Sequence, residues 1–456
     1  MKKISRRKFI STTAHGAAGL GIIAGCTTRT TSPDIRPPSA PEGLDVLVDY
    51  TDDGTPQAFL TWNEHNLTDI TGAVSETGIS GYNIYRCLVK ENEAEHYDTP
   101  INTSPVQGTS YIDEDNLIDL GSYKYRISAL DRNNNESPLS SVSQVKIIRP
   151  SIIFKATDTA ASSGAKINAD VIKTMVHSAI KQMQKITDTG KAYESLFSKG
   201  VSNATAIAIK INCLANNGLC THPEVVNAII DGLTQMLEGT FPKDNITVFD
   251  DRMPSYLKNA GFPLKNDPGD YKIITLFNDD NAWSSPATVH NSTQRFAKIV
   301  DEVDYIINVP VLKNHSNAGI TFALKNFFGI IDRPGDMHDD SAVSQETWCD
   351  PYIAEVYKKV ADKVAVTIGD AVFGAYKNGP ATSPNFILNT ILVGTDPVAM
   401  DMAALKFIND ARNEKGLSTI PTEAGAGNAS AQHIITASSD AYKLGRLNKK
   451  IVEVSL

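Results

Sequence analysis

The sequence predicts a multidomain protein in which an N-terminal all-β sandwich precedes an α/β domain with a mostly parallel sheet. The length is the first observation, because 456 residues are enough for two or three domains of about 150 residues each. The second is a hydrophobic period of two in short runs between residues 38 and 148, which is typical of β-strands. The third is a change beyond Pro150 to strands that alternate with amphipathic helices, which favours a parallel sheet covered on both faces.

The composition excludes several classes of protein. Lysine and arginine number 43 against 52 acidic residues, and residues 1–25 contain five of the basic residues and no acidic one. The rest of the chain therefore has a net charge of −14, and we expect no nucleic-acid partner, because affinity for nucleic acid depends on Lys and Arg at the phosphates. The five cysteines contain no CxxC pair, so we expect no zinc ribbon and no iron–sulfur cluster.

Residues 1–25 have the pattern of an export signal, a basic start followed by a modestly apolar stretch. SRRKF at residues 5–9 resembles the twin-arginine motif, and IAGC at residues 23–26 resembles a bacterial lipobox. These resemblances imply export by the twin-arginine route and lipidation of Cys26. The expected location is the bacterial cell envelope, on the periplasmic side or at the cell surface. Residues 26–37 are rich in Thr, Ser and Pro and are expected to form a tether.

The region 38–148 consists of short β-rich runs separated by Asp, Gly, Asn and Pro turns, and about 110 residues of this kind is typical of a sandwich. It resembles a fibronectin type III domain. Trp62 lies in the second run, GYNIYR at residues 81–86 forms the third, and Tyr123 or Tyr125 would supply a tyrosine corner. The resemblance implies a spacer, or a module that docks on a protein or glycan partner.

The second domain, residues 150–456, is expected to alternate strands and helices along the chain. Strands are predicted at residues 205–214, 246–250, 305–312, 364–368 and 386–393. Helices are predicted at residues 171–183, from residue 223 after a capping box at 221–224, at 320–330 and at 397–409.

Polar side chains follow several of these strands, and ligands gather at the carboxyl ends of strands in such sheets. Each of these lysines and histidines, taken singly, is explained by a surface or structural role. Taken together, they favour a cationic pocket. Its predicted members come from the end of the first strand and from the segment after the third: Lys210, Asn212, Lys313, His315, Lys325, Asn326 and His338. For His222 two interpretations are about equally supported: a functional imidazole at the mouth of this pocket, or simply the first residue of its helix.

Motifs in order from about residue 150 to the C-terminus resemble the DUF362 family, a group of uncharacterised proteins. They include KNH at residues 313–315, AGIT at 318–321, LKN at 324–326 and GTDPVAMD at 394–401. Some members of that family carry iron–sulfur cysteine runs, which this chain lacks. The family label implies no reaction.

The spacing of His315, Gly319, Lys325 and His338 also resembles nickel-pincer lactate racemases, in which the lysine lies ten positions after the first histidine. In that family the lysine holds the cofactor covalently, a later histidine ligates nickel, and two other histidines move the α-proton of the substrate. The pocket and this resemblance together assign His315, His222 and Lys313 to catalysis and His338 to metal binding. Four further residues are assigned to cofactor binding: Lys325, Lys210, Asn212 and Asn326.

Two classes of function stay open on this basis. One is a metal- or cofactor-dependent enzyme, with a metal or a lysine-linked cofactor, that acts on a small anionic substrate. The other is a non-catalytic cell-surface lipoprotein that binds an anion and docks a partner through its sandwich. In both, the membrane is a partner through the N-terminal lipid. A disulfide between Cys213 and Cys220 is expected after export, and the alternative is two buried thiols.

Overall fold

The computed structural model describes residues 35–51, 53–65, 78–216, 218–338, 349–423 and 429–456. The predicted export signal, Cys26 and most of the predicted tether lie outside the described residues. No helix among the described residues is both long enough and apolar enough to cross a membrane.

The N-terminal region forms two three-stranded antiparallel sheets, as the period-two pattern predicts. One sheet has the order β1–β2–β4, with β1 Asp45–Tyr50, β2 Pro56–Thr61 and β4 Ser110–Asp113. The other has the order β3–β5–β6, with β3 Ile79–Leu88, β5 Ser122–Asp131 and β6 Ser143–Lys146.

Aromatic side chains organise this region. The Trp62 and Tyr82 rings pack edge to face with their centroids 5.2 Å apart, and both residues are buried. The hydroxyl of Tyr123 accepts a hydrogen bond from the Ile118 N–H at 2.8 Å and donates to the Asn116 carbonyl at 3.4 Å. A tyrosine at the start of a strand that bonds to backbone a few residues upstream is the arrangement of a tyrosine corner.

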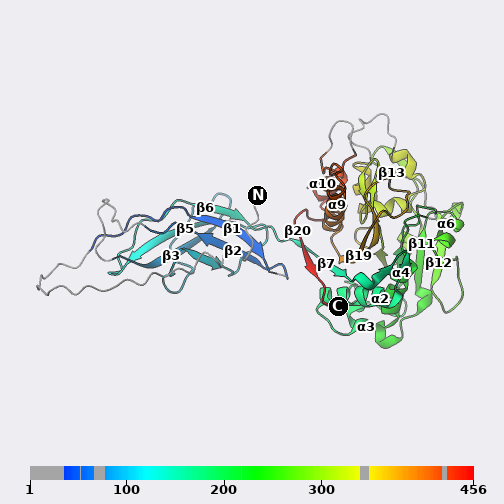
Figure 1. The fold of residues 1–456 in the computed structure, drawn as a ribbon, viewed down its shortest axis with the longest axis horizontal. Helices are drawn as coiled ribbons and strands as arrows, with labels where there is room; N and C mark the ends of the chain where they lie inside the picture. The colour runs from blue at the N-terminus through cyan, green and yellow to red at the C-terminus, as the bar shows by residue number, and fades with distance from the viewer. Residues whose placement is uncertain (1–34, 52, 66–77, 217, 339–348, 424–428) are drawn as a thin grey trace, which may run out of the picture. The chain divides into compact units, whose positions relative to one another are not determined.

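The C-terminal region is built on a ten-stranded mixed sheet, whose main path runs β12–β11–β10–β15–β18–β19–β7–β20 (Figure 1). The strands from β12 to β18 are parallel to one another, and β19 is antiparallel to both β18 and β7. A short hairpin of β16 and β17 extends from β18. The strand bounds are β7 Ser151–Thr157, β10 Ile207–Lys210, β11 Ile246–Asp250, β12 Lys272–Thr275, β15 Tyr305–Asn308, β16 Val311–His315, β17 Gly319–Thr321, β18 Val364–Ala375, β19 Phe386–Gly394 and β20 Lys449–Glu453.

Helices cover both faces of this sheet, and its strands are therefore buried on both sides. Along β10, Ile207 and Ile209 join the apolar cluster of α2 and α4, whereas Ala208 joins the cluster of α8, α9 and α10. Figure 1 shows α2 and α3 on one side of the sheet and α9 and α10 on the other. The helix bounds are α2 Ala169–Gln184, α3 Thr189–Glu194, α4 Pro223–Thr234, α5 Met236–Gly239, α6 Pro254–Asn259, α7 Ile299–Glu302, α8 Tyr352–Lys358, α9 Pro397–Glu414 and α10 Gln432–Ser438.

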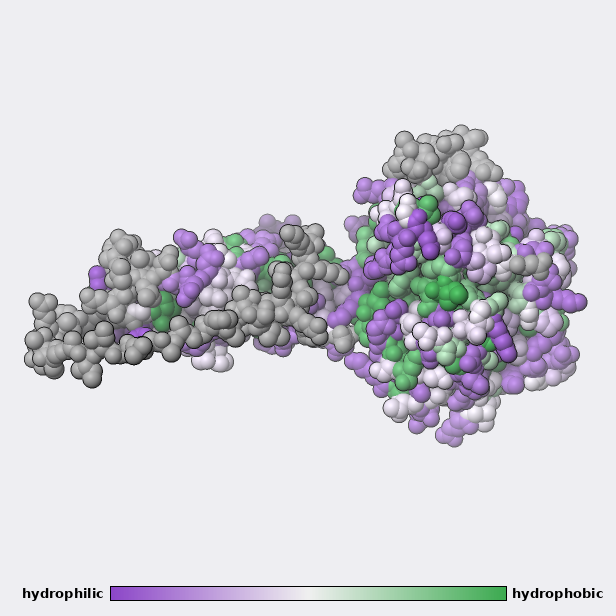
Figure 2. All heavy atoms as spheres, in the orientation of Figure 1, coloured by the Kyte–Doolittle hydropathy of each residue, from purple (hydrophilic) through white to green (hydrophobic). Residues whose placement is uncertain are grey.

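The outer surface of this region differs from its two apolar clusters. On the face drawn in Figure 2, hydrophilic residues cover most of the C-terminal region, and hydrophobic residues gather in a smaller central area. A sheet with apolar clusters on both faces and a hydrophilic exterior is the three-layer α/β arrangement that the alternating pattern predicts.

Three local predictions in this region are wrong. Residues 320–330 do not form an α-helix, because the chain first completes β17 and then forms a 3₁₀ helix at Lys325–Ile330. The predicted strand 305–312 is two strands, β15 and β16, separated by Val309 and Pro310. A proline has no N–H to donate to the ladder, and its place between the two strands matches the break.

The capping box at residues 221–224 is the third error. The N-cap of α4 is His222, which makes no side-chain capping bond. Thr221 instead accepts from the Asn212 N–H and donates to the Val309 carbonyl, so its hydroxyl joins two loops rather than closing a helix.

Candidate functional site

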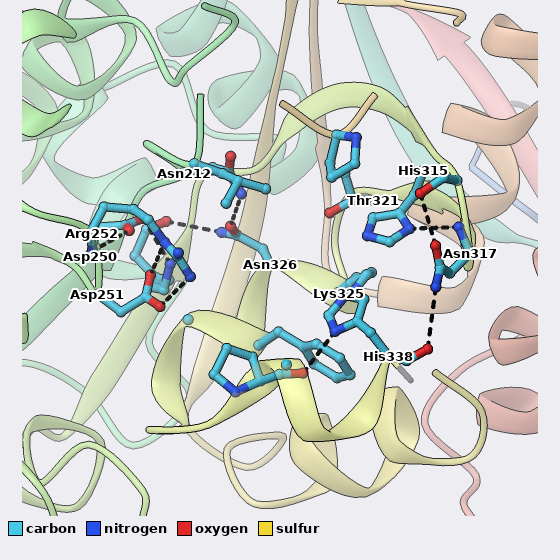
Figure 3. A pocket seen from close by; sticks show the side chains of 18 residues that line it. Asn212, Asp250, Asp251, Arg252, His315, Asn317, Thr321, Lys325, Asn326 and His338 are labelled. Carbon is cyan, nitrogen blue, oxygen red and sulfur yellow. Dashed lines mark hydrogen bonds and ion pairs between the residues drawn. The ribbon is translucent and has the colours of Figure 1, made fainter. Parts of the chain in front are cut away.

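A cavity of about 420 Å³ opens at the carboxyl edge of the parallel strands (Figure 3). Its lining comes from the ends of β10 and β11, the β16–β17 hairpin, and the 3₁₀ helices at Lys325–Ile330 and Pro334–Met337. The predicted pocket residues on this lining are Lys210, Asn212, His315, Lys325, Asn326 and His338. The strand-end rule therefore located the cavity.

Lys325 and His338 form a hydrogen-bonded pair on one wall. Nζ of Lys325 lies 2.9 Å from Nε2 of His338 and 3.7 Å from the centre of the Phe328 ring. Nδ1 of His338 lies 2.7 Å from the Pro334 carbonyl oxygen, which can only accept. The neutral imidazole therefore has its proton on Nδ1 and offers the lone pair of Nε2 to the lysine.

Lys325 is a buried amine, 5% exposed. Burial lowers the pKa of Lys325 to about 8, because desolvation disfavours the charged form. Within the part of the chain that the structure describes, no carboxylate lies within ion-pair distance of Nζ. In mildly alkaline solution the Lys325 side chain is consequently an uncharged amine in a substantial fraction of the molecules.

His315 has the opposite tautomer. Its Nδ1 accepts from the backbone N–H groups of Asn317 at 3.0 Å and Ala318 at 3.2 Å, so the ring proton is on Nε2. Burial, together with the nearby charges of Lys325 and His338, holds the pKa of His315 well below its usual value. The His315 and His338 rings stack with centroids 5.3 Å apart. The cavity thus has a neutral N–H donor next to a neutral nitrogen acceptor.

The opposite wall consists of two acid–base pairs (Figure 3). Nζ of Lys210 lies 3.1 Å from Asp250, and the guanidinium of Arg252 binds both oxygens of Asp251. Burial and the adjacent Asp250 carboxylate raise the pKa of Asp251 to about 7. Gly329 lies against this wall, and a Cβ there would come within 2.7 Å of the Lys210 Nζ. These two carboxylates offset the charges of Lys210 and Arg252.

A chain of amides connects the two walls. Nδ2 of Asn212 donates to Oδ1 of Asn326 at 3.0 Å, and Nδ2 of Asn326 donates to Oδ1 of Asn308 at 2.8 Å. Asn308 in turn donates to the Ala323 carbonyl at 2.9 Å. Each amide is oriented by its neighbour, so the floor of the cavity is held in one arrangement.

Asp401 positions the segment that carries Lys325. This fully buried carboxylate accepts from the N–H groups of Ala323 at 2.6 Å and Leu324 at 3.3 Å. His433 lies 3.4 Å from the same carboxylate. The bend that follows β17 is therefore anchored to α9 immediately before Lys325, which the sequence assigned to cofactor binding.

Two predicted site residues lie outside the cavity lining. Lys313 is fully buried, and its Nζ donates to Oδ1 of Asn212 at 2.7 Å and to the Leu219 carbonyl at 3.3 Å. It therefore supports a lining residue from behind. His222 is paired with Asp370, with Nδ1 2.7 Å from the carboxylate, and packs on Phe373. The structure favours the helix-terminus interpretation for His222.

Cys213 and Cys220 are neighbouring buried thiols. Cys213 and Cys220 share a hydrogen bond, which raises the pKa of the Cys213 thiol and lowers that of Cys220. Both are free in the structure, and the disulfide expected after export stays a prediction.

Several lining residues were not in the predicted set. Asp251 and Arg252 directly follow β11, so the strand-end rule could have found them. Phe328 and Thr321 carry no comparable signal, because apolar and hydroxyl residues occur throughout the chain. Among the described residues, no group of three or more His, Cys, Asp or Glu side chains is arranged to hold a metal ion.

Comparison with known proteins agrees with the predicted family over part of the chain. Residues 207–406 match the family described as a domain of unknown function, DUF362. The chain carries a DUF362 domain. The match confirms the predicted family over a narrower span than residues 150–456, and every lining residue of the cavity lies within it. The chain has no match among the curated proteins.

Similar solved structures align with about a quarter of the chain. Titin module A71 from human cardiac muscle is 18% identical, with 24% of this chain and 91% of that chain covered and a TM-score of 0.19. The third fibronectin III domain of the human KIAA0343 protein is 17% identical, with 28% and 96% covered and a TM-score of 0.20. At these TM-scores the similarities support no conclusion about the DUF362 domain or its function.

Proposed function

We propose that this chain is an exported, lipid-anchored enzyme whose DUF362 domain carries out acid–base chemistry on a small anionic substrate. The observation that carries the proposal is that Lys325 contacts His338, whose ring stacks on that of His315 and has the opposite tautomer. His338 presents a lone pair at Nε2, and His315 presents an N–H. A proton acceptor and a proton donor on one cavity wall are what proton transfer next to a carbonyl or hydroxyl group requires.

Charge supports an anionic substrate. Three basic side chains line the cavity, Lys210, Arg252 and Lys325, against the two carboxyls of Asp250 and Asp251. Since the pKa of Asp251 is raised to about 7, its carboxyl is partly protonated at neutral pH. Lys325, with a pKa of about 8, is then mostly charged. The cavity consequently has an excess of positive charge that a carboxylate or phosphate would balance.

The Lys325 and His338 pair also fits a lysine-linked cofactor. The amine of Lys325 would hold the group, and the Nε2 lone pair of His338 would face it. Such a group, with or without a metal, would act as an electron acceptor or Lewis acid when bound. A metal would take its remaining ligands from the group itself or from outside the described side chains.

The export and anchoring parts of the proposal rest on the twin-arginine and lipobox motifs ahead of Cys26. For the N-terminal region we propose a fibronectin type III-like spacer or docking module. The Tyr123 hydroxyl, bonded to backbone groups five and seven residues upstream, supports this assignment.

The test is ligand-detected NMR of the full chain in D₂O with a panel of small carboxylates and phosphates. We expect at least one compound to bind and to exchange its α-proton for deuterium. His338→Gln should abolish the exchange and retain binding, whereas Lys325→Met should weaken binding. His96→Gln is the matched control, because the His96 side chain is 70% exposed.

Purification from the native envelope, with the intact mass recorded, keeps any group attached to Lys325 in the assay. Binding without exchange in the wild-type protein would favour the non-catalytic, anion-binding lipoprotein. No binding by any anion of the panel would overturn the proposal.

A further inference from the structure

We propose that Lys325 forms an imine with a small aldehyde or ketone that carries an anionic group. This inference rests on the proposed function and names its substrate class. The starting observation is that the Lys325 Nζ contacts an imidazole lone pair and an aromatic ring instead of a carboxylate. An ion pair would hold the amine protonated and unreactive, whereas a desolvated amine beside a base is a nucleophile for carbonyl carbon.

His338 and His315 have different roles in imine formation, proton transfer for His338 and polarisation of the carbonyl group for His315. Nε2 of His338 lies 2.9 Å from the amine and can accept its protons. Among the described residues, no protein atom accepts the Nε2 proton of His315, which lines the same cavity. That proton is available to hydrogen-bond the carbonyl oxygen of a bound substrate and to polarise the carbonyl group.

The reaction balances without an oxidant or a reductant. The neutral Nζ attacks the carbonyl carbon, and one Nζ proton passes through His338 to the substrate oxygen, which becomes a hydroxyl. The second Nζ proton follows the same route, the C–O bond breaks, and the oxygen leaves as water. The carbon and Nζ are then joined by a C=N bond.

Arg252 would bind the anionic group of the substrate. Its Nε and Nη2 donate to Asp251, at 2.9 Å and 2.5 Å, whereas Nη1 has no hydrogen-bond partner among the described residues, and the side chain lines the cavity. Partial protonation of Asp251 frees additional positive charge on the guanidinium. A carboxylate or a phosphate could take this position, since both accept bidentate or single charge-assisted hydrogen bonds from Arg.

Lys313 is an internal control for this assignment. Burial lowers its pKa to about 8, as it does for Lys325, so basicity alone does not distinguish the two amines. Lys313, however, donates to Asn212 and to the Leu219 carbonyl, and it is not part of the cavity lining. If the cavity rather than basicity alone determines reactivity, only Lys325 should react.

The experiment is reductive trapping of the full chain at pH 8 with cyanoborohydride and glyoxylate, followed by peptide mapping. Parallel samples contain glycolaldehyde, an uncharged aldehyde, or glycolaldehyde phosphate. We expect Lys325 to be trapped ahead of all other lysines, with about tenfold preference for the anionic aldehydes, the effect of one charge-assisted hydrogen bond. Lys325→Arg should abolish the adduct, and His338→Asn should slow its formation. The ratio of glyoxylate to glycolaldehyde phosphate identifies the preferred anion.

Trapping of Lys325 no faster than of Lys313 or of surface lysines would overturn the inference. Glyoxylate binding without reduction is measured by NMR in the same samples. If glyoxylate binds and Lys325 is not trapped, imine formation is wrong and the proposed function stands. If neither trapping nor binding of any anion is observed, both are wrong.

Discussion

The imidazole rings of His315 and His338 stack with centroids 5.3 Å apart and hold their protons on opposite ring nitrogens. Two backbone N–H groups fix one tautomer, and one backbone carbonyl fixes the other. The tautomers follow from hydrogen-bond partners whose donor or acceptor nature is unambiguous. The protein backbone thereby places a donor and an acceptor on the same cavity wall.

This arrangement predicts distinct nitrogen-15 NMR patterns for the two rings. At pH 7, His315 should be the Nε2–H tautomer and His338 the Nδ1–H tautomer. His315 should stay neutral below pH 6.5, because burial and neighbouring positive charge lower its pKa. Assignment uses His315→Gln and His338→Gln. Detection of the same tautomer in both rings, or of a charged His315 at pH 6.5, would contradict the structure.

The parallel sheet and the place of the cavity could be predicted from the sequence, because both depend on short-range patterns. Buried strands such as β10 and β11 are apolar runs, and the residue after each run lies at the carboxyl edge. Lys210 and Asp250 are found by this rule. The same rule locates His315, which is the last residue of β16.

What the sequence could not provide are contacts between residues far apart in the chain. Lys313 looks like a site residue because it lies two positions before His315, but its Nζ is bonded to the Asn212 side chain and the Leu219 carbonyl behind the wall. In place of the helix expected over residues 320–330, the chain first completes β17, and Asp401, about 80 residues later, accepts the N–H groups of Ala323 and Leu324.

Asp401→Asn should destabilise the domain by about 2–3 kcal/mol, since an amide can accept only one of the two backbone N–H groups and turns a donor toward the other. It should also reduce trapping of Lys325 by glyoxylate, because the bend before the lysine loses its anchor. Denaturant unfolding and peptide mapping measure the two effects. Asp410→Asn is the control on the same helix, where the ion pair with Lys406 is about half exposed and a change within about 0.5 kcal/mol is expected. An Asp401→Asn protein as stable as Asp410→Asn would show that Asp401 does not anchor the bend.

The N-terminal motifs predict two separable defects. Replacement of Arg6 and Arg7 by lysine should block export, because the twin-arginine receptor reads the arginine pair. Cys26→Ala should allow export and release the chain from the membrane, because it removes the thiol to which we expect the lipid to be attached. Fractionation and immunoblotting measure both. If the Cys26→Ala protein remains in the membrane fraction, the lipid-anchor assignment is wrong.

The pairing of His222 with Asp370 makes part of the stability dependent on pH. His222 lies at the N-terminus of α4, where the helix dipole disfavours a cation, and burial acts in the same direction. The Asp370 carboxylate, 2.7 Å from Nδ1, outweighs both and leaves the pKa of His222 above its usual value of 6.5. A histidine whose pKa is raised by folding binds its proton more tightly in the folded state. Its contribution is therefore complete below pH 6.5 and is lost as pH rises through the folded-state pKa.

Asp370→Asn and His222→Gln should each lower the free energy of unfolding by about 1.5–3 kcal/mol at pH 5.5, which is the range for a hydrogen bond to a charged group. The deficit of His222→Gln should shrink as the pH rises from 6.5 to 9, because the wild-type protein then loses the charge that the variant lacks. Urea unfolding at a series of pH values measures this difference. His96→Gln, at a mostly exposed position 4.0 Å from Asp98, should follow the wild-type curve at every pH. A His222→Gln deficit that is constant from pH 5.5 to 9 would mean that His222 contributes through packing on Phe373 rather than through its charge.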